Sequence, residues 1–290
     1  MKSRVNSCVG GERMIIDVHN HLYPPEIQKN QEAISLREPY FDKLTHNKVH
    51  KWGTAKELIE RMDADCVDQC WCFGFAFADL GLCQVCNDYL AWAAQQWPDR
   101  IKPFAVLPPR HPKMAEELVR VKKMGFIGVG ELFPQGQDFD LTNLSHTTPL
   151  VEACQELGLM INTHTAEPVG HDYAGKGDVG PKEAYTFCSH HPDVKVIFAH
   201  FGGGLWLYET MPEVREVLKN AAYDTAAWVY LYGAEHMKAA FAAGVGKKML
   251  FGTDWPLLTN KRFLSRIEGA GLTEEQKADL MGLNAQRFAS

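Results

Sequence analysis

Two histidines near the start of the sequence have the residue type and spacing of a metal site. His19 and His21 lie in the apolar, strand-like segment Ile15–Leu22. Because alternate side chains of a strand point to the same side, the two imidazoles would lie about 7 Å apart along the strand and could converge on one cation. Asp17, one step earlier on that side, would orient a ligand from behind. A solvent-facing strand end with incidental histidines is the alternative.

Three later strand-like segments also end in side chains of the ligand type. They are Met160–His164, Ile197–His200 and Phe251–Asp254. In a barrel of parallel strands, catalytic groups gather at the carboxyl ends of the strands. A set of nitrogen and oxygen donors without thiolates suits catalytic Zn²⁺, Mn²⁺, Fe²⁺ or Co²⁺ better than a structural zinc. The sequence therefore predicts a divalent cation, with Zn²⁺ preferred, and leaves open whether one or two are bound.

The elements that must position these residues follow a regular alternation. Short apolar runs alternate with longer amphipathic stretches, which predicts parallel strands joined by helices in an α/β fold. Eight strands are expected, as a (β/α)8 TIM barrel requires. The expected strands are Met14–Leu22, Cys66–Phe75, Lys102–Pro108, Phe126–Phe133, Leu159–His164, Val194–His200, Ala221–Thr225 and Lys248–Thr253.

Helical periodicity fills the intervals between these strands. The third expected helix carries Met114, Leu118 and Val121 at a spacing that gives one apolar face. The last opens with a capping-box spacing between Thr273 and Gln276. The expected helices are Lys56–Asp63, Val85–Trp97, Met114–Met124, Leu150–Leu157, Pro181–His190, Leu207–Leu218, Glu235–Ala243 and Thr273–Phe288.

Two connections that follow strands are unusually long. They are Tyr23–Thr54 and Thr165–Gly180, and in a barrel both would rise over the face that holds the active site. We therefore expect two lids, the first of them an insertion at about 23–54. Aromatic and basic side chains on these loops or at the rim are candidates for contact with substrate: Trp52, Trp255, Tyr173, His171 and Lys176.

Composition limits the class of protein and its partners. The chain has 290 residues and a formal net charge of −6, with 36 acidic and 30 basic residues. A single domain over 1–290 is expected at this length. Without a run of basic residues, nucleic acid is an unexpected partner. No segment approaches the roughly 20 apolar residues of a membrane-spanning helix. The substrate is expected to be a small molecule, with an anionic group as one option, and a homo-oligomer is left open.

Location is predicted from the first residues and the cysteines. Met1–Arg13 lacks the apolar core and cleavage site of a secretory signal, which predicts a cytoplasmic protein. The chain has eight cysteines. Cys66, Cys70 and Cys72 lie in or beside an apolar run, so we expect reduced, buried thiols rather than a disulfide framework.

The motifs together resemble the amidohydrolase superfamily. D-x-H-x-H in the first strand, H-F-G-G-G after the sixth and G-T-D-W-P after the eighth are similar to its amidohydrolase-2 branch, which includes aminocarboxymuconate-semialdehyde decarboxylase. The similarity covers nearly the whole chain, up to Asn284–Phe288. It implies His19, His21, His164 and Asp254 as metal ligands.

The same resemblance leaves alternative roles open for His200 and Glu131. It implies His200 either as a ligand of a second metal or as the group that polarises substrate or handles a proton. Glu131 ends the fourth strand, where other amidohydrolase subgroups carry a residue that bridges two metals. If its side chain points inward, it could bridge a second cation held by His164 and His200. The alternative is a carboxylate paired with a nearby base or solvated in the loop.

Three functions are compatible with the sequence, and the first of them, catalysis by a metal-dependent hydrolase, is the one that the sequence predicts. The first is metal-assisted hydrolysis of an amide, ester or lactone, with Asp254 taking a proton from water and His200 donating to the developing oxyanion. The second is non-oxidative decarboxylation of a carboxylated ring or enal at the same mononuclear site. The third is a catalytically silent barrel that binds or assembles with a partner.

Overall fold

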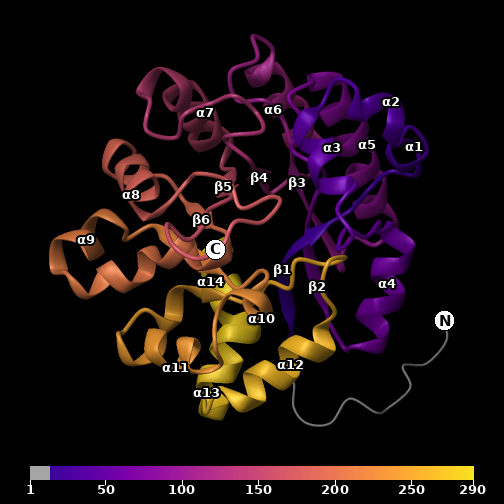
Figure 1. The fold of residues 1–290 in the computed structure, drawn as a ribbon. Helices are drawn as coiled ribbons and strands as arrows, with labels where there is room; N and C mark the ends of the chain where they lie inside the picture. The colour runs from indigo at the N-terminus through magenta and orange to yellow at the C-terminus, as the bar shows by residue number, and fades with distance from the viewer. Residues whose placement is uncertain (1–13) are drawn as a thin grey trace.

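The structure, a computed structural model, describes residues 14–290 and is an eight-stranded parallel barrel surrounded by helices (Figure 1). The strands are hydrogen-bonded in sequence order, which confirms the predicted (β/α)8 fold. They are β1 (Ile16–His21), β2 (Gln69–Phe73), β3 (Ile101–Ala105), β4 (Gly128–Leu132), β5 (Met160–Thr163), β6 (Val196–Phe198), β7 (Ala221–Asp224) and β8 (Met249–Leu250).

The barrel closes between β1 and the segment that follows β8. The amide of Val18 donates to the carbonyl oxygen of Phe251 at 2.8 Å, and the amide of Asp254 donates to that of His19 at 3.0 Å. Asn20 and Trp255 form a further parallel bridge. Closure thus places the carboxyl end of β1 directly beside the carboxyl end of β8, where the predicted ligands lie.

Large apolar side chains fill the interior of the barrel. Trp71 and Phe104 stack at 5.5 Å between ring centroids, and Phe73 meets Phe104 edge to face. Ile16 and Val18 of β1 belong to the same buried cluster, together with Ala285 from the last helix. The lower part of the barrel is therefore a packed core, and an open space remains only toward the carboxyl ends of the strands.

The outer helices agree with the predicted pattern in most places. A capping box confirms the start of the first, because the Thr54 hydroxyl accepts from the Glu57 amide and the Glu57 carboxylate accepts from the Thr54 amide. The predicted capping box of Thr273 and Gln276 is also present. The helices after the first lid are α4 (Ala55–Ala64), α5 (Leu80–Gln96), α6 (Met114–Lys123), α7 (Leu144–Leu157), α8 (Pro181–His190), α9 (Pro212–Val217), α10 (Trp228–Leu231), α11 (Glu235–Ala242), α12 (Asn260–Gly269), α13 (Glu274–Ala278) and α14 (Asn284–Ala289).

One predicted helix begins later than expected, and one helix was not predicted. The helix expected over Leu207–Leu218 begins only at Pro212, because proline lacks an amide hydrogen and is favoured at the first position of a helix. The segment before it, His200–Thr210, is a 3-10 helix interrupted by a turn in which Phe201 and the following glycines have positive φ. The helix α12 was not expected from the sequence.

The two long connections that are expected to act as lids touch each other. The first, 23–54, contains α1 (Pro25–Lys29), α2 (Gln31–Ser35) and α3 (Pro39–Thr45), which Figure 1 shows beside α5. The second, 165–180, has no helix. A Cβ atom placed on Gly175 would lie 2.7 Å from Cδ2 of Leu44, so the lids meet closely at this glycine.

The prediction of reduced cysteines needs one correction. Cys70 and Cys72 are free and buried, as expected. Cys66, however, forms a disulfide. It lies before β2 in a turn, with a φ of 57°, and not in the strand, so its side chain is not enclosed by the core. Within residues 14–290, no helix is long and apolar enough to cross a membrane.

Candidate metal centre and active-site cavity

Three of the predicted ligands meet at the closure of the barrel. The Nε2 atoms of His19 and His21 lie 3.1 Å apart. Oδ1 of Asp254 lies 3.5 Å from Nε2 of His21 and 3.8 Å from Nε2 of His19. Residues separated by more than 230 positions in the sequence thus present one nitrogen or oxygen atom each to a common point, all within 4.8 Å of one another.

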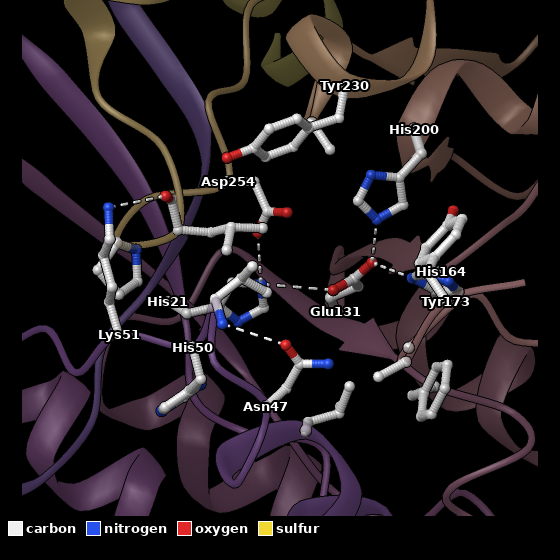
Figure 2. Close-up of a pocket in the computed structure, with 18 of the residues that line it drawn as sticks. His21, Asn47, His50, Lys51, Glu131, His164, Tyr173, His200, Tyr230 and Asp254 are labelled. Carbon is white, nitrogen blue, oxygen red and sulfur yellow. Dashed lines mark hydrogen bonds and ion pairs between the residues drawn. The ribbon is translucent and has the colours of Figure 1, made fainter.

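Glu131 points inward and lies between two pairs of histidines. Its Oε2 is 3.5 Å from Nε2 of both His19 and His21, and its Oε1 is 3.0 Å from Nδ1 of His164 and 3.3 Å from Nε2 of His200. Figure 2 shows this carboxylate at the centre of the group. Burial alone would raise the pKa of Glu131, but the neighbouring histidines hold it well below its ordinary value.

His164 and His200 occupy the far side of Glu131 from His21. Nε2 of His164 lies 2.9 Å from the carbonyl oxygen of Lys176, so only Nδ1 faces the site. Nδ1 of His200 lies 3.1 Å from the carbonyl oxygen of Ala226, which leaves Nε2 toward Glu131. Burial alone would lower the pKa of His200, but the hydrogen bond and the charge of Glu131 raise it to about 9. The sequence predicted four ligands around one ion. In the structure, Glu131 lies between His164 and the other three, which are His19, His21 and Asp254.

Asp224, at the end of β7, belongs to the site although the sequence did not single it out. Its Oδ2 accepts a hydrogen bond from Nδ1 of His19 at 2.8 Å, and its Oδ1 accepts from the amides of His200 and Ala226 at 3.1 and 3.0 Å. A carboxylate bonded to Nδ1 fixes the ring and leaves Nε2 for a cation. Burial alone would lower the pKa of His19, but Asp224 and Glu131 raise it well above its ordinary value. The sequence offered one signal for Asp224: like Asp254, it is an aspartate at the end of an apolar strand.

Asp17 does not lie beside the histidine rings, and the expectation that it shares their side is wrong. The register of β1 against β2 shifts between Asp17 and Asn20, which breaks the alternation of side chains. The Asp17 carboxylate accepts hydrogen bonds of 2.7 Å from Arg61 and from the Thr253 hydroxyl, and one of 3.0 Å from the Thr253 amide. It thus holds the residue that precedes Asp254.

The turn after β6 needs its glycines to bring His200 into the site. Gly203 has a φ of +59°, and a Cβ atom there would overlap the backbone carbonyl of Ala166. His200 itself has a φ of 55°. A left-handed turn that passes this close to another loop favours glycine over any residue with a Cβ atom.

A cavity of about 560 Å³ opens directly above the candidate ligands. Its floor contains His21, Glu131, His164, His200 and Asp254. Most of the wall is apolar or aromatic and comes from the strand ends, both lids and the loops after β7 and β8. These wall residues include Tyr23, Leu44, Val49, Phe75, Phe133, Tyr173, Ala174, Tyr230, Leu231, Pro256 and Leu257.

The candidate substrate residues have different positions relative to this cavity. Tyr173 and His171 line it. Trp52 contacts the rings of Tyr23 and His50 and lies behind them. Trp255 is 7% exposed and packs in a cluster with α4 and α5 residues. The amino group of Lys176 donates to backbone carbonyls of its own loop, including that of His171. Pro256, next to Trp255, lines the cavity in its place.

The donor set fits a divalent cation. Both Nδ1 of His19 and Nδ1 of His21 face oxygen atoms, Asp224 at 2.8 Å and the carbonyl of Gly74 at 3.4 Å, which directs both Nε2 atoms toward each other. Two imidazoles whose Nε2 atoms carry no hydrogen can both bind a cation placed between them. Two carboxylates beside them supply the negative charge that stabilises a divalent ion.

Comparisons with known proteins identify the family and the fold. The family model described as amidohydrolase matches residues 16–288. No curated protein matches the sequence. Among solved structures, a 5-carboxyvanillate decarboxylase from Sphingomonas paucimobilis superposes with a TM-score of 0.78 at 16% identity, covering 96% of this chain and 99% of that one.

Two further solved structures contain manganese. A dihydroxybenzoic acid decarboxylase from Polaromonas sp. JS666, bound to manganese and the inhibitor 2-nitroresorcinol, gives a TM-score of 0.71 at 18% identity over 96% and 97% of the two chains. A 5-carboxyvanillate decarboxylase from Novosphingobium aromaticivorans, with manganese and a nitrobenzoic acid, gives 0.73 at 14% identity over 97% of each chain. Similarity at this level of identity supports the fold. The match of the family model over nearly the whole sequence shows that the chain belongs to the amidohydrolase family.

Proposed function

We propose that this protein is a metal-dependent, non-oxidative decarboxylase of small carboxylated aromatic or enal compounds. The observation that carries the proposal is the convergence of His19, His21 and Asp254 at one point, with His21 and Asp254 in the floor of a cavity whose wall is mainly aromatic and apolar. Structures of the same fold are decarboxylases of hydroxylated benzoic acids, two of them with manganese. This reading replaces hydrolysis as the first choice.

The reaction needs no oxidant. The bond between a ring carbon and the carboxylate breaks, CO₂ leaves, and the electron pair left on the ring carbon takes up a proton. A divalent cation, when bound, supplies a Lewis acid for the oxygen atoms of the substrate and for the negative charge that develops. Zn²⁺ and Mn²⁺ both suit the donor set of imidazoles and carboxylates.

The side chains of the floor handle the proton in this proposal. His200 directs Nε2 toward Glu131 and the cavity, and Asp254 places a carboxylate beside His21. Figure 2 shows both groups pointing into the same space. One of them can donate to the ring carbon while the other keeps the substrate oxygens oriented.

The cavity wall selects the substrate in this proposal. Phe75, Phe133, Tyr173 and Tyr230 offer aromatic surface to a planar ring. Lys51, on the first lid, also lines the cavity and could meet an anionic group. A cavity of about 560 Å³ is within the range of pockets that enclose small organic ligands.

The proposal is tested by release of CO₂. We expect the protein loaded with Mn²⁺ or Zn²⁺ to decarboxylate at least one member of a panel of hydroxybenzoates and carboxylated enals, followed by ultraviolet absorbance and by trapped ¹⁴CO₂. Asp254→Asn should abolish the activity, and Asp193→Asn, an exposed carboxylate, should not change it. No CO₂ from any acid with either metal would contradict the proposal.

Hydrolysis is the second candidate, because one observation favours it. Glu131 has one oxygen toward His19 and His21 and the other toward His164 and His200, as expected of a carboxylate between two cations. A pair of cations there would supply the activation of water that hydrolysis of an amide, ester or lactone needs.

Metal content separates the two candidates. A binuclear hydrolase should purify with close to two metals per chain by elemental analysis, and Glu131→Gln should lose one of them. A mononuclear decarboxylase should hold one metal in both proteins. Lactones and N-acyl amino acids are the substrates to assay if two metals are found.

A further inference from the structure

Tyr23 lies immediately beyond β1, two residues after His21. Its amide donates to the carbonyl oxygen of Gly53 at 2.8 Å, which ties this position to the end of the first lid. Its ring packs edge to face against Trp52 and His50, with centroids 5.0 and 5.4 Å away. The backbone and ring are thus held in place beside the cavity, which Tyr23 lines.

The hydroxyl of Tyr23 has no hydrogen-bond partner within residues 14–290, although the residue is only 7% exposed. Burial raises the pKa of this phenol, and the negative charges of Asp254 and Glu131 raise it further. The hydroxyl is therefore close enough to both carboxylates to sense their charge.

A hydroxyl that lines a cavity and bonds to no protein group is left to bond with water or with a ligand that displaces the water. Buried tyrosines usually bond their hydroxyl to a protein group. Others in this chain do so: the Tyr223 hydroxyl donates to Glu209 at 2.6 Å. A hydroxyl left unbonded beside candidate metal ligands is suited to a partner that arrives from outside.

We propose that the Tyr23 hydroxyl donates a hydrogen bond to an oxygen atom of the substrate, beside the atoms that His21 and Asp254 present, and so positions the substrate. This inference rests on the proposed function only in taking the cavity as the substrate site. The same donor would serve a carboxylate, a phenolate or the carbonyl oxygen of an ester, and would discriminate against a substrate without oxygen at that position.

Tyr23→Phe tests the role, since it removes the hydroxyl and keeps the ring against Trp52 and His50. Without ligand, we expect an unchanged metal content and an unfolding temperature equal to or above that of the wild type, because no protein hydrogen bond is lost. A clear loss of stability would show that the hydroxyl has a structural partner and would overturn the inference.

Binding provides the second measurement. We expect Mn²⁺-loaded Tyr23→Phe to bind 2-nitroresorcinol and hydroxybenzoates roughly 10- to 100-fold more weakly than the wild type by calorimetry. Any substrate should show a similar loss in kcat/KM. Tyr40→Phe, on the same lid but not among the cavity residues, should match the wild type.

The outcomes distinguish this inference from the proposed reaction. Equal binding by the wild type and Tyr23→Phe would overturn the inference, as would a wild type that binds none of these compounds. Binding that depends on Tyr23, without release of CO₂ from any acid, would contradict the decarboxylase proposal and leave the inference supported.

Discussion

Oδ2 of Asp224 lies 2.8 Å from Nδ1 of His19, and both side chains are fully buried. The same carboxylate accepts from the amide of His200. Asp224 on β7 therefore holds His19, a ligand candidate on β1. It also holds the start of the loop after β6, which carries His200, a candidate for handling the proton. The two halves of the site are mechanically joined through Asp224.

Asp224→Asn should weaken metal binding. The amide has the size of the carboxylate, but it lacks the charge that stabilises the Nδ1–H of His19 and can turn an N–H group toward that ring. We expect the affinity for Mn²⁺ or Zn²⁺ to fall about 10- to 100-fold, measured by competition with a chelator. Asp193→Asn is the control, and a wild-type affinity in Asp224→Asn would mean that His19 does not need this partner.

Bound metal should stabilise the fold. A cation at about 100 times its Kd adds about 2.7 kcal/mol to the free energy of unfolding, which raises the Tm of a chain of this size by roughly 4–5 °C. EDTA should reverse the shift, and Asp254→Asn should reduce it. A protein that gains no stability from either cation would instead support the third function considered, a catalytically silent barrel.

Acid should destabilise the protein partly through His236. Trp206 donates its indole hydrogen to Nε2 of His236 at 3.0 Å, and burial lowers the pKa of this histidine from 6.5 to about 4. Between these two pKa values the unfolded chain binds more protons than the folded one, so stability falls as the pH is lowered. Because the ring is partly exposed, we expect a contribution of about 1–2 kcal/mol.

Urea unfolding at pH 7 and pH 5 measures this contribution. His236→Gln retains an acceptor for Trp206 and should lose less stability between the two pH values than the wild type does. His190→Gln, at an exposed histidine, should retain the wild-type dependence. The assignment to His236 is wrong if both variants depend on pH as the wild type does.

Gly203 and Gly204 form a matched pair in the turn after His200. Both have positive φ, but only at Gly203 would a Cβ atom overlap a backbone carbonyl, while none of the described atoms lies within 4 Å at Gly204. We expect Gly204→Ala to cost about 1–2 kcal/mol from backbone conformation alone. Gly203→Ala should cost about 1–3 kcal/mol more, because the Ala166 loop must move. If Gly203→Ala and Gly204→Ala had equal free energies of unfolding, the Ala166 loop would be able to move aside at no measurable cost.

The strand ends explain why much of the site could be predicted. His19, His21 and Asp254 each follow an apolar run, and the carboxyl ends of parallel strands must come together in a barrel. The sequence pattern of β1 alone could not predict its register shift, because the shift arises from the pairing of β1 with β2. That shift separates Asp17 from the histidine rings.

Side-chain direction in loops was the other limit. Trp52 and Trp255 were candidates because of their residue type and place in the sequence, but their rings pack beside the cavity and other residues line it. Asp224 was missed because an aspartate after an apolar run also suits a turn. Asp224 belongs to the site because it bonds to Nδ1 of His19, which lies 205 residues earlier in the sequence, on another strand.

The backbone bond from the amide of Asp254 to the carbonyl of His19 has a consequence for biosynthesis. His19 leaves the ribosome long before Asp254 is made. During most of translation, β1 therefore cannot pair with the segment after β8. A nascent chain can hold neither the closed barrel nor the three converging ligands until nearly its last segment has emerged. Capture of a cation by these candidate ligands would therefore be a late event in the life of each molecule, and a chain cut short before residue 254 would lack the site.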